Sequence, residues 1–580
     1  MTVIVSAGHV DHGKSALIRA LTGTDPDRWA EEKRRGMTID LGFAHTVLPS
    51  GRSVSFVDVP GHHQFVRNML VGVGTADACL FVVDAGEGWR PQSEEHLRIL
   101  DLLGVRDGVI ALAKIDQVDD ETVELARLDV ADHVVGTALA TAPVIATSAT
   151  TGAGIDQLRT ALDELVVPSD VAGAEQGRSR LWVDRSFTVA GSGTVVTGVS
   201  LGGGFAVDDR VVIGPQERPG RIRGIQVRGT SIDRVGPRER VALNLGGVAR
   251  TEVARGHAVV RPGEWIPTRR FDAELSTLAA LDHDVKSRGN YVLHAGTAEQ
   301  VVRLQVIGGR SIEPGSTGLV RLTSAGPWPL PLEPGDRFIV RESGRRETIG
   351  GGLVLDVAPV RSLSRAAPDR RWERVVAERR WVTVDELWRL TGHRAAAVVG
   401  PWVAERETVA ELAASLRERI RAAPPPGLSM ALLDDHERAV LETLDDVDVA
   451  GEWATAADAR DVLAEHPVVA ELFGGGFQPP APDAPRDVLR ELRRRGVLAE
   501  RDGVWFHREA VDSAARVAAR LIAADPEGFT VAQFRDATGA TRKFCLPLLN
   551  ELDARGITRK RDPVRIAGPS LPPADGYEVT

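Results

Sequence analysis

The chain of 580 residues predicts a multidomain protein, with an α/β domain followed by two β-barrels and then α+β winged-helix repeats. Three observations predict this order. Apolar strands alternate with helical patterns up to about residue 170, short strands recur from 179 to 361, and helical patterns with an internal repeat fill 365–580. At about 150 residues per domain, a chain of this length holds roughly four domains.

The composition is that of an ordinary soluble protein, with 43% hydrophobic and 26% charged residues. Two cysteines exclude a disulfide scaffold and an all-cysteine zinc site. The net charge of −10 excludes a uniformly basic nucleic-acid coat but allows local basic patches. Because the chain has neither a long apolar run nor a signal-peptide pattern at its start, we expect a cytoplasmic protein without a membrane partner. A monomer is the default expectation.

The α/β prediction rests on buried strands rich in β-branched residues. The five runs are Val3–Ala7, Val54–Val59, Cys79–Ala85, Val109–Lys114 and Val144–Ser148. Helical patterns lie between them, for example at Ser93–Leu103 and Ile155–Leu165. This alternation predicts a mainly parallel sheet with helices on both faces, over residues 1–170.

The two barrels are predicted from alternating strands that recur every 8–12 residues between Gly, Pro and Asp. A break near Pro262–Pro267 divides the segment into 179–262 and 263–361. A small, polar stretch at 166–178 predicts a linker before them.

The winged-helix prediction rests on two repeats. Thr383-Val384 precedes Thr391-Gly392 at the spacing with which Thr530-Val531 precedes Thr538-Gly539. A Leu-rich helix, Arg-Gly and two short strands occur at 488–502 and again 60 residues later. Two unrelated helix–hairpins are the alternative. The predicted boundaries are 365–427, 428–508 and 509–570.

A phosphate-binding loop follows the first strand. The pattern G-x-x-x-x-G-K-S is formed by Gly8, His9, Val10, Asp11, His12, Gly13, Lys14 and Ser15. Glycines let successive backbone N–H groups point at one phosphate, and the N-terminus of the next helix adds partial positive charge. Lys14 is expected to reach the β and γ phosphates, and Ser15 to hold Mg²⁺.

Two further segments complete the expected Mg²⁺ and γ-phosphate site. Asp58 ends the second hydrophobic strand, where a carboxylate holds Mg²⁺ in P-loop NTPases. Gly61 offers a backbone N–H to the γ-phosphate, and the hydroxyl of Thr38 completes the Mg²⁺ shell in the triphosphate state.

The identity of the base is predicted from the end of the fourth strand. Asp116, two residues after Lys114, accepts from the N1–H and the exocyclic amine of guanine, a pair of donors that adenine lacks. Ser148 and Ala149 follow the last strand, where a backbone N–H meets the guanine carbonyl. The predicted cofactors are therefore GTP or GDP and Mg²⁺, in a P-loop GTPase domain.

These motifs together resemble the elongation factor Tu group of translational GTPases, in the strings GHVDHGKS, RGMTIDLGFA and DVPGHHQF. The strings at 185–198 and 337–352 are similar to the second and third domains of that group. With its winged-helix appendix, and above all the segment near 526–566, the chain resembles the bacterial selenocysteine-specific elongation factors, the SelB family. The resemblance covers essentially the whole chain and is diffuse in 365–480.

The resemblance implies roles for individual residues. His62 would orient the attacking water or stabilise the transition state, with Lys14 and Thr38 as the other catalytic groups. One position departs from the family pattern, because Ala113 stands where the guanine motif of the family begins with an Asn, whose side chain braces the phosphate-binding loop and contacts the base. We therefore expect weak to moderate nucleotide affinity and spontaneous exchange without a dedicated exchange factor.

The resemblance also implies that Asp40, Arg185 and Arg240 surround the aminoacyl group of the tRNA. A selenol is an anion at neutral pH, so two guanidinium groups would favour it over the neutral side chains of Ser or Cys. Ordinary ion pairs on the barrel surface are the alternative reading of the two arginines.

A basic segment near the C-terminus predicts an RNA site. Residues 542–561 carry six basic side chains against two acidic ones. We expect Arg542 and Lys543 at the start of a recognition helix, and Arg559, Lys560 and Arg561 in the wing. Together they would clamp the backbone of an RNA hairpin, which proteins recognise largely by shape. A solvated basic face is the alternative.

The resemblance implies a factor that delivers selenocysteinyl-tRNA to the ribosome at UGA codons recoded by an mRNA hairpin, and hydrolyses GTP on codon recognition. Two alternatives remain at this point. One is another Tu-like GTPase that carries tRNA, and the other is a nucleic-acid-binding winged-helix regulator switched by its P-loop domain. The two-barrel segment favours a tRNA carrier over the regulator.

Overall fold

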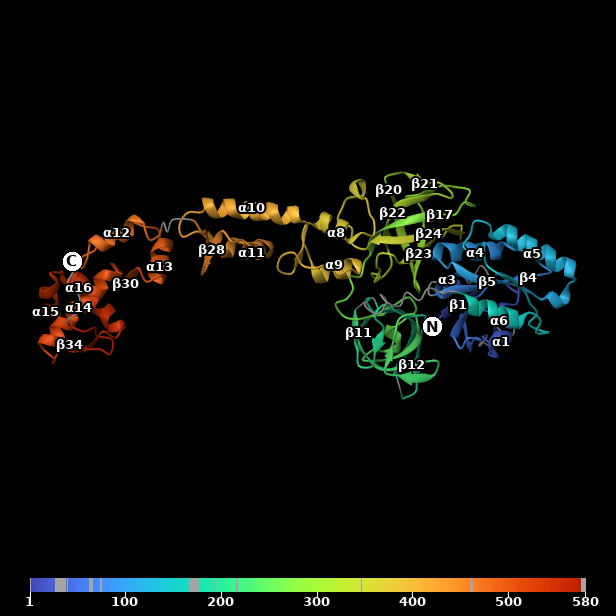
Figure 1. The fold of residues 1–580 in the computed structure, drawn as a ribbon, viewed down its shortest axis with the longest axis horizontal. Helices are drawn as coiled ribbons and strands as arrows, with labels where there is room; N and C mark the ends of the chain where they lie inside the picture. Colours follow the sequence, from blue (N-terminus) through green and yellow to red (C-terminus); the bar gives the residue numbers. More distant parts are fainter. Residues whose placement is uncertain are drawn as a thin grey trace. The chain divides into compact units, whose positions relative to one another are not determined.

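The computed structural model describes residues 2–26, 38, 40–61, 66–73, 76–165, 177–191, 193–214, 217–345, 347–458 and 463–574. The chain divides into two compact units, Met1–Ala397 and Val398–Thr580, which carry the labels used below (Figure 1). Among the described residues, no helix is long and apolar enough to cross a membrane.

A six-stranded sheet in the order β2-β3-β1-β4-β5-β6 begins the first unit. Its strands are β1 (Thr2–Ala7), β2 (Gly42–Val47), β3 (Ser53–Asp58), β4 (Ala78–Asp84), β5 (Asp107–Ala113) and β6 (Val144–Ala146). The five predicted strands are confirmed and pair in parallel. The antiparallel edge strand β2 was not predicted, because it begins with glycine and most of its residues are exposed or partly exposed.

Helices cover both faces of this sheet, as predicted. On one face pack α1 (Lys14–Thr22) and α6 (Ile155–Glu164). On the other pack α3 (Val66–Val73), α4 (Pro91–Leu103) and α5 (Asp120–Val134). Figure 1 shows α4 and α5 above the strands. Because parallel strands end at one edge, the loops after β1, β3, β4 and β5 meet there.

The first barrel is built from an eight-stranded sheet. Its strands are β7 (Arg180–Trp182), β8 (Arg185–Val189), β9 (Gly193–Leu201), β11 (Arg210–Ile213), β12 (Arg218–Val227), β13 (Thr230–Ile232), β15 (Arg240–Gly246) and β16 (Ala258–Val260). The order β11-β16-β7-β9-β15-β12 is closed by the pairing of β11 with β12. The small pair β10 (Phe205–Ala206) and β14 (Arg234–Val235) lies beside it.

The second barrel is closed in the order β17-β22-β20-β19-β23-β24. Its strands are β17 (Arg270–Thr277), β19 (Tyr291–Ala295), β20 (Ala298–Ile307), β22 (Thr317–Ser324), β23 (Arg337–Glu342) and β24 (Glu347–Asp356), with the pair β18 (Val285–Lys286) and β21 (Ser311–Ile312). Both predicted barrels are therefore present. Ile339 of β23 belongs to the same apolar cluster as α4, which joins this barrel to the first domain.

The helical pair α8 (Trp372–Arg379) and α9 (Val384–Thr391) falls in the first unit. Arg374 of α8 forms an ion pair with Asp356 at the end of β24, with 2.9 Å between the nitrogen and the oxygen. The predicted winged-helix segment begins at 365, whereas the second compact unit begins at Val398.

The second unit contains the repeated helix and wing. Its elements are β26 (Trp402–Val403), α10 (Arg406–Ala422), β27 (Leu428–Ser429), α11 (Asp435–Leu441), β28 (Val447–Ala450), β29 (Trp453–Ala456), α12 (Pro467–Gly474), α13 (Arg486–Arg494), β30 (Leu498–Arg501), β31 (Val504–His507), α14 (Arg508–Ala524), β32 (Phe529–Thr530), α15 (Val531–Thr538), α16 (Arg542–Ala554), β33 (Thr558–Arg561) and β34 (Val564–Ala567). A helix followed by a two-stranded wing occurs at α13–β31 and again at α16–β34, so the 60-residue repeat is confirmed.

The shorter repeat is a pair of identically capped helices. The hydroxyls of Thr383 and Thr530 accept the backbone N–H three residues on, which is the usual bond of a helix N-cap. Gly392 and Gly539 end the two helices in the left-handed conformation. The sequence period therefore marks the first and last residues of α9 and α15.

Candidate functional site

The loop between β1 and α1 has the geometry of a phosphate cradle. Gly8 has a φ of 127°, and a Cβ there would lie 2.1 Å from the carbonyl oxygen of Val82. Gly13 has a φ of 91° and precedes α1. Lys14 is only 6% exposed, and its ammonium donates to the carbonyls of Gly8 (3.1 Å) and His9 (2.6 Å). Lys14 therefore holds the loop curled over the helix N-terminus.

Three side chains with oxygen atoms, Ser15, Thr38 and Asp58, lie close together beside this loop. The hydroxyl of Ser15 donates to Asp58 at 2.6 Å and lies 2.9 Å from the hydroxyl of Thr38. The hydroxyl of Ser6 donates to the second oxygen of Asp58, also at 2.6 Å. Burial raises the pKa of Asp58, although bonds from Ser15 and Ser6 oppose that shift. Such a set of carboxylate and hydroxyl oxygens fits Mg²⁺, which prefers oxygen ligands.

Gly61 closes the cradle from the side of β3. A Cβ at Gly61 would come within 2.6 Å of the Lys14 nitrogen and 2.7 Å of the Val10 nitrogen. Only glycine fits so close to the loop. His62, the predicted catalytic residue, lies outside the described residues.

Helix α4 contacts the cradle through two side chains that sequence reasoning missed. Nδ1 of His96 accepts the N–H of Gly8 at 3.0 Å, and Oε1 of Gln92 accepts the N–H of Val10 at 3.2 Å. Burial lowers the pKa of His96 well below its usual range, which keeps the imidazole neutral and able to accept. Neither residue belongs to a local motif, so only the tertiary contact identifies them.

The remaining cradle side chains differ in burial. His12 is fully buried, and burial lowers its pKa to about 4. Its ring meets that of His9 edge to face, with 5.0 Å between the centroids. Asp11 is exposed and has a φ of 61°. His12 is therefore a packed, neutral side chain, whereas the side chain of Asp11 faces solvent.

The predicted base-binding residues gather at the same sheet edge. Asp116 is exposed in the short 3-10 helix η2 (Ile115–Gln117), which follows Lys114. The N–H of Ser148 donates to the carbonyl of Ala153 at 2.9 Å. The N–H of Ser148 is therefore already hydrogen-bonded. The N–H of Ala149 is the better candidate to donate to the guanine carbonyl.

A charged cluster lies between the first domain and the first barrel. Arg185 donates to Asp40 at 3.0 Å, and Arg240 donates to Asp184 at 3.0 Å. The ring of Phe43 lies 3.5 Å from the guanidinium carbon of Arg240 and 5.3 Å from that of Arg185. The structure thus brings together the three residues predicted to surround the aminoacyl group.

Sequence reasoning missed the other members of this cluster. Asp184 holds Arg240, Arg255 lies 3.6 Å from Asp40, and Phe43 packs between the arginines. The hydroxyl of Thr197 donates to Asp184. Asp184 is adjacent to Arg185 in the sequence, but the others come from separate strands and loops.

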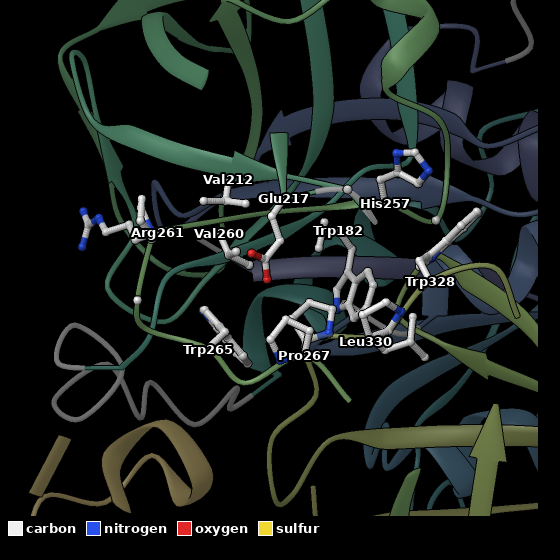
Figure 2. A pocket seen from close by; sticks show the side chains of 17 residues that line it. Trp182, Val212, Glu217, His257, Val260, Arg261, Trp265, Pro267, Trp328 and Leu330 are labelled. Atoms are coloured by element: carbon white, nitrogen blue, oxygen red, sulfur yellow. The ribbon is translucent and has the colours of Figure 1, made fainter. Parts of the chain in front are cut away.

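The first unit also has a hollow of about 190 Å³ between its two barrels. Trp182, Trp265 and Trp328 surround it with His257 and Leu330 (Figure 2). The guanidinium carbon of Arg178 lies 4.3 Å from the Trp265 ring. Because its walls are mainly apolar and include three tryptophans, the hollow does not suit a triphosphate with Mg²⁺.

In the second unit, a groove of about 800 Å³ runs between α16 and the β33–β34 wing. Arg542, Lys543 and Lys560 line it, with Asn550 and Asp502. Asn550 donates to Asp502 at 2.7 Å and accepts from Arg565 at 3.2 Å. A helix begins at Arg542, as predicted, and its basic side chains share a groove with the wing.

The three basic wing residues divide between two faces. Lys560 pairs with Arg565 across the hairpin and lines the groove. Arg559 and Arg561, one position to either side, point to the opposite face because side chains alternate along a strand. The groove therefore holds one of the three predicted wing side chains.

Comparisons with known proteins agree with these sites. Residues 1–168 match the family model described as the elongation factor Tu GTP binding domain, and residues 520–567 match the model described as the elongation factor SelB winged helix. The protein is therefore a GTPase that uses GTP, GDP and Mg²⁺, and its partners are nucleic acids.

Several relatives are named selenocysteine-specific elongation factors. The chain is 32% identical to the one from Escherichia coli (strain K12), over 96% of this chain and 97% of that protein. It is 39% identical to the one from Desulfomicrobium baculatum, over 61% of this chain and 56% of that protein. A crystal structure of the bacterial selenocysteine-specific elongation factor EF-Sec has the same fold, with a TM-score of 0.75, 24% identity, and coverage of 98% of this chain and 100% of that one. The chain belongs to the family of selenocysteine-specific elongation factors.

Proposed function

We propose that this GTPase carries selenocysteinyl-tRNA to the ribosome and delivers it at UGA codons that an mRNA hairpin recodes, hydrolysing GTP on codon recognition. The observation that carries the proposal is the cluster of Asp40, Arg185 and Arg240 between the nucleotide domain and the first barrel. The chain acts as a monomer.

The cluster supports selection of a selenolate by charge. Each of the two arginines is a quarter exposed and is held by a carboxylate, so its direction is fixed before a ligand arrives. Phe43 supplies an apolar wall against the guanidinium planes. A selenolate gains charge-assisted bonds in such a site, whereas the neutral hydroxyl of Ser gains only weaker ones.

The nucleotide domain controls when the tRNA is delivered, through binding and hydrolysis of GTP. Lys14 and the backbone of the cradle bind the phosphates, while Ser15, Thr38 and Asp58 would hold Mg²⁺, which shields the phosphate charge when bound. Thr38 belongs to the segment that also carries Asp40, so a change at the γ-phosphate is transmitted to the aminoacyl pocket. We assign orientation of the attacking water to His62.

The groove of the second unit supports RNA binding. Arg542 and Lys543 are exposed and have room for a phosphate backbone, and a bound strand would also meet Lys560. We infer that the partner is the mRNA hairpin, because RNA hairpins are recognised by shape and by unstacked loop bases rather than by a long base-pair code.

The test is a competition between Sec-tRNA and Ser-tRNA for the GTP-bound protein. The Arg185→Ala and Arg240→Ala variants should each lose about 10-fold or more of the preference for Sec-tRNA, since a charge-assisted bond is worth about 1.5–3 kcal/mol. Arg210→Ala, on a strand of the same barrel that carries no cluster residue, is the control. Retention of the full preference in both pocket variants would refute the proposal.

A further inference from the structure

Ala113 ends β5 immediately before Lys114, at the position that lacks the expected polar side chain. Its register partner on the neighbouring strand is Asp84, and the N–H of Ala85 donates to the carbonyl of Ala113 at 2.9 Å. A buried carboxylate therefore ends β4 directly beside the alanine.

Asp84 joins two loops of the nucleotide edge. One carboxylate oxygen accepts the N–H of Gly86 at 2.8 Å and that of Glu87 at 3.3 Å. The other lies 2.8 Å from the ammonium of Lys114. Burial alone would raise the pKa of Asp84, but the bonds from Lys114 and Gly86 outweigh it and lower the pKa, so the carboxylate is ionised.

Lys114 extends this connection to the phosphate cradle. Its backbone is left-handed, with a φ of 58°, a conformation that side chains other than glycine rarely adopt. Its Cε lies 3.9 Å from where a Cβ of Gly13 would stand. The Lys114 side chain therefore lies along the cradle with its ammonium held at the far end by Asp84.

We propose that Asp84 is a positioning residue for the guanine nucleotide, which takes over through Lys114 the bracing that an asparagine at position 113 would give. An asparagine amide braces a loop by neutral hydrogen bonds. Here a partly buried ion pair, with the Asp84 and Lys114 side chains 8% and 31% exposed, holds the ammonium end of Lys114, whose side chain runs close to Gly13 of the cradle. Loss of one partner of such a pair leaves the other charge uncompensated.

The experiment measures the dissociation rate of a fluorescent GDP from the full chain with Mg²⁺ present. Asp84→Ala should release GDP about 10-fold faster, and Asp84→Asn should give a smaller increase, because its amide oxygen still accepts the N–H of Gly86. Ala113→Asn alone should change the rate by less than about threefold, since the loops are already braced.

The double variant Asp84→Ala/Ala113→Asn decides the proposal. We expect the asparagine to restore the dissociation rate to within about threefold of the natural chain. If the asparagine slows release equally with and without Asp84, the two positions do not share a role. An unchanged rate in Asp84→Ala would also overturn the proposal.

Asp101→Ala is the matched control for folding. Asp101 is a carboxylate of the same domain that accepts one backbone N–H, from Ala138 at 2.9 Å, on α4 rather than at the nucleotide edge. Its loss should lower the melting temperature without changing the rate of GDP release. Equal acceleration of release by Asp101→Ala and Asp84→Ala would mean that general destabilisation accounts for both.

Discussion

The nucleotide edge of the first unit and the basic groove of the second both suit phosphate, but by opposite means. At the nucleotide edge, Lys14 and Asp58 are buried and already bonded to protein atoms. At the groove, Arg542 and Lys543 are exposed. A buried, pre-bonded site fixes geometry for chemistry, whereas an exposed basic groove gives affinity that depends on salt.

The nucleotide edge should be the more sensitive of the two to a single charge. Lys14→Ala should weaken GTP binding by about 100-fold or more, because hydrogen bonds to charged groups are worth about 1.5–3 kcal/mol each. Equilibrium titration with a fluorescent GTP measures this. Lys286→Ala, which removes an exposed charge from β18, is the control. Binding within threefold of the natural chain in Lys14→Ala would contradict the assigned role.

Geometry at the nucleotide edge should matter almost as much as charge. Gly61→Ala adds a methyl group 2.6 Å from the Lys14 nitrogen, and overpacking of about 2 kcal/mol would weaken GTP binding by about 30-fold. At Gly236 an added Cβ meets nothing within 4 Å, so Gly236→Ala should leave binding unchanged. Similar affinities for the two alanine variants would argue against a closed cradle.

At the basic groove, the loss of affinity for RNA should depend on whether the substituted side chain faces the groove or the opposite side. Lys543→Ala should lower affinity for the mRNA hairpin by about 10-fold at low salt and reduce the salt slope by about one. Arg559→Ala removes the same charge from the opposite face of the wing and should have a smaller effect. Filter binding at several salt concentrations compares them, and equal losses would mean that charge acts without regard to the groove.

The smallest expected effect concerns pH. Burial lowers the pKa of His12 to about 4, so the folded chain keeps this imidazole neutral while the unfolded chain protonates it below its ordinary value of 6.5. Stability is therefore complete above that ordinary value and declines as the pH falls towards the folded pKa. His12→Gln should reduce this loss of stability at acidic pH. Each kcal/mol of unfolding free energy that is retained should keep the Tm about 2–4 °C higher. Calorimetry at neutral and acidic pH measures the drop in Tm. A drop in His12→Gln as large as in the natural chain would contradict the prediction.

The sequence predicts those parts of each site that are contiguous. The residues from Gly8 to Ser15 are neighbours in the chain, and a backbone that curls around phosphate requires its glycines in a fixed order. Likewise, Thr383 and Gly392 mark the ends of one helix by local capping. In both cases the interactions that fix the backbone join residues within about ten positions of each other. The local sequence pattern therefore predicts the structure.

The contacts that sequence reasoning missed join distant segments. His96 reaches Gly8 across 88 positions, and Asp84 is the register partner of Ala113 only because β4 and β5 are adjacent in the sheet. The split of the wing, with Lys560 facing the groove, depends on where β33 begins. Register and strand order are set by tertiary packing, and the sequence alone does not give them.

We propose that the guanine-nucleotide site and the RNA-binding groove are coupled within one chain. To test this, GTP turnover by the full chain, loaded with Sec-tRNA, is compared on ribosomes at a UGA codon with and without the downstream hairpin. We expect faster turnover with the hairpin, and loss of that difference in an Arg542→Ala/Lys543→Ala variant that still binds GTP. Equal turnover with and without the hairpin in the natural chain would contradict it.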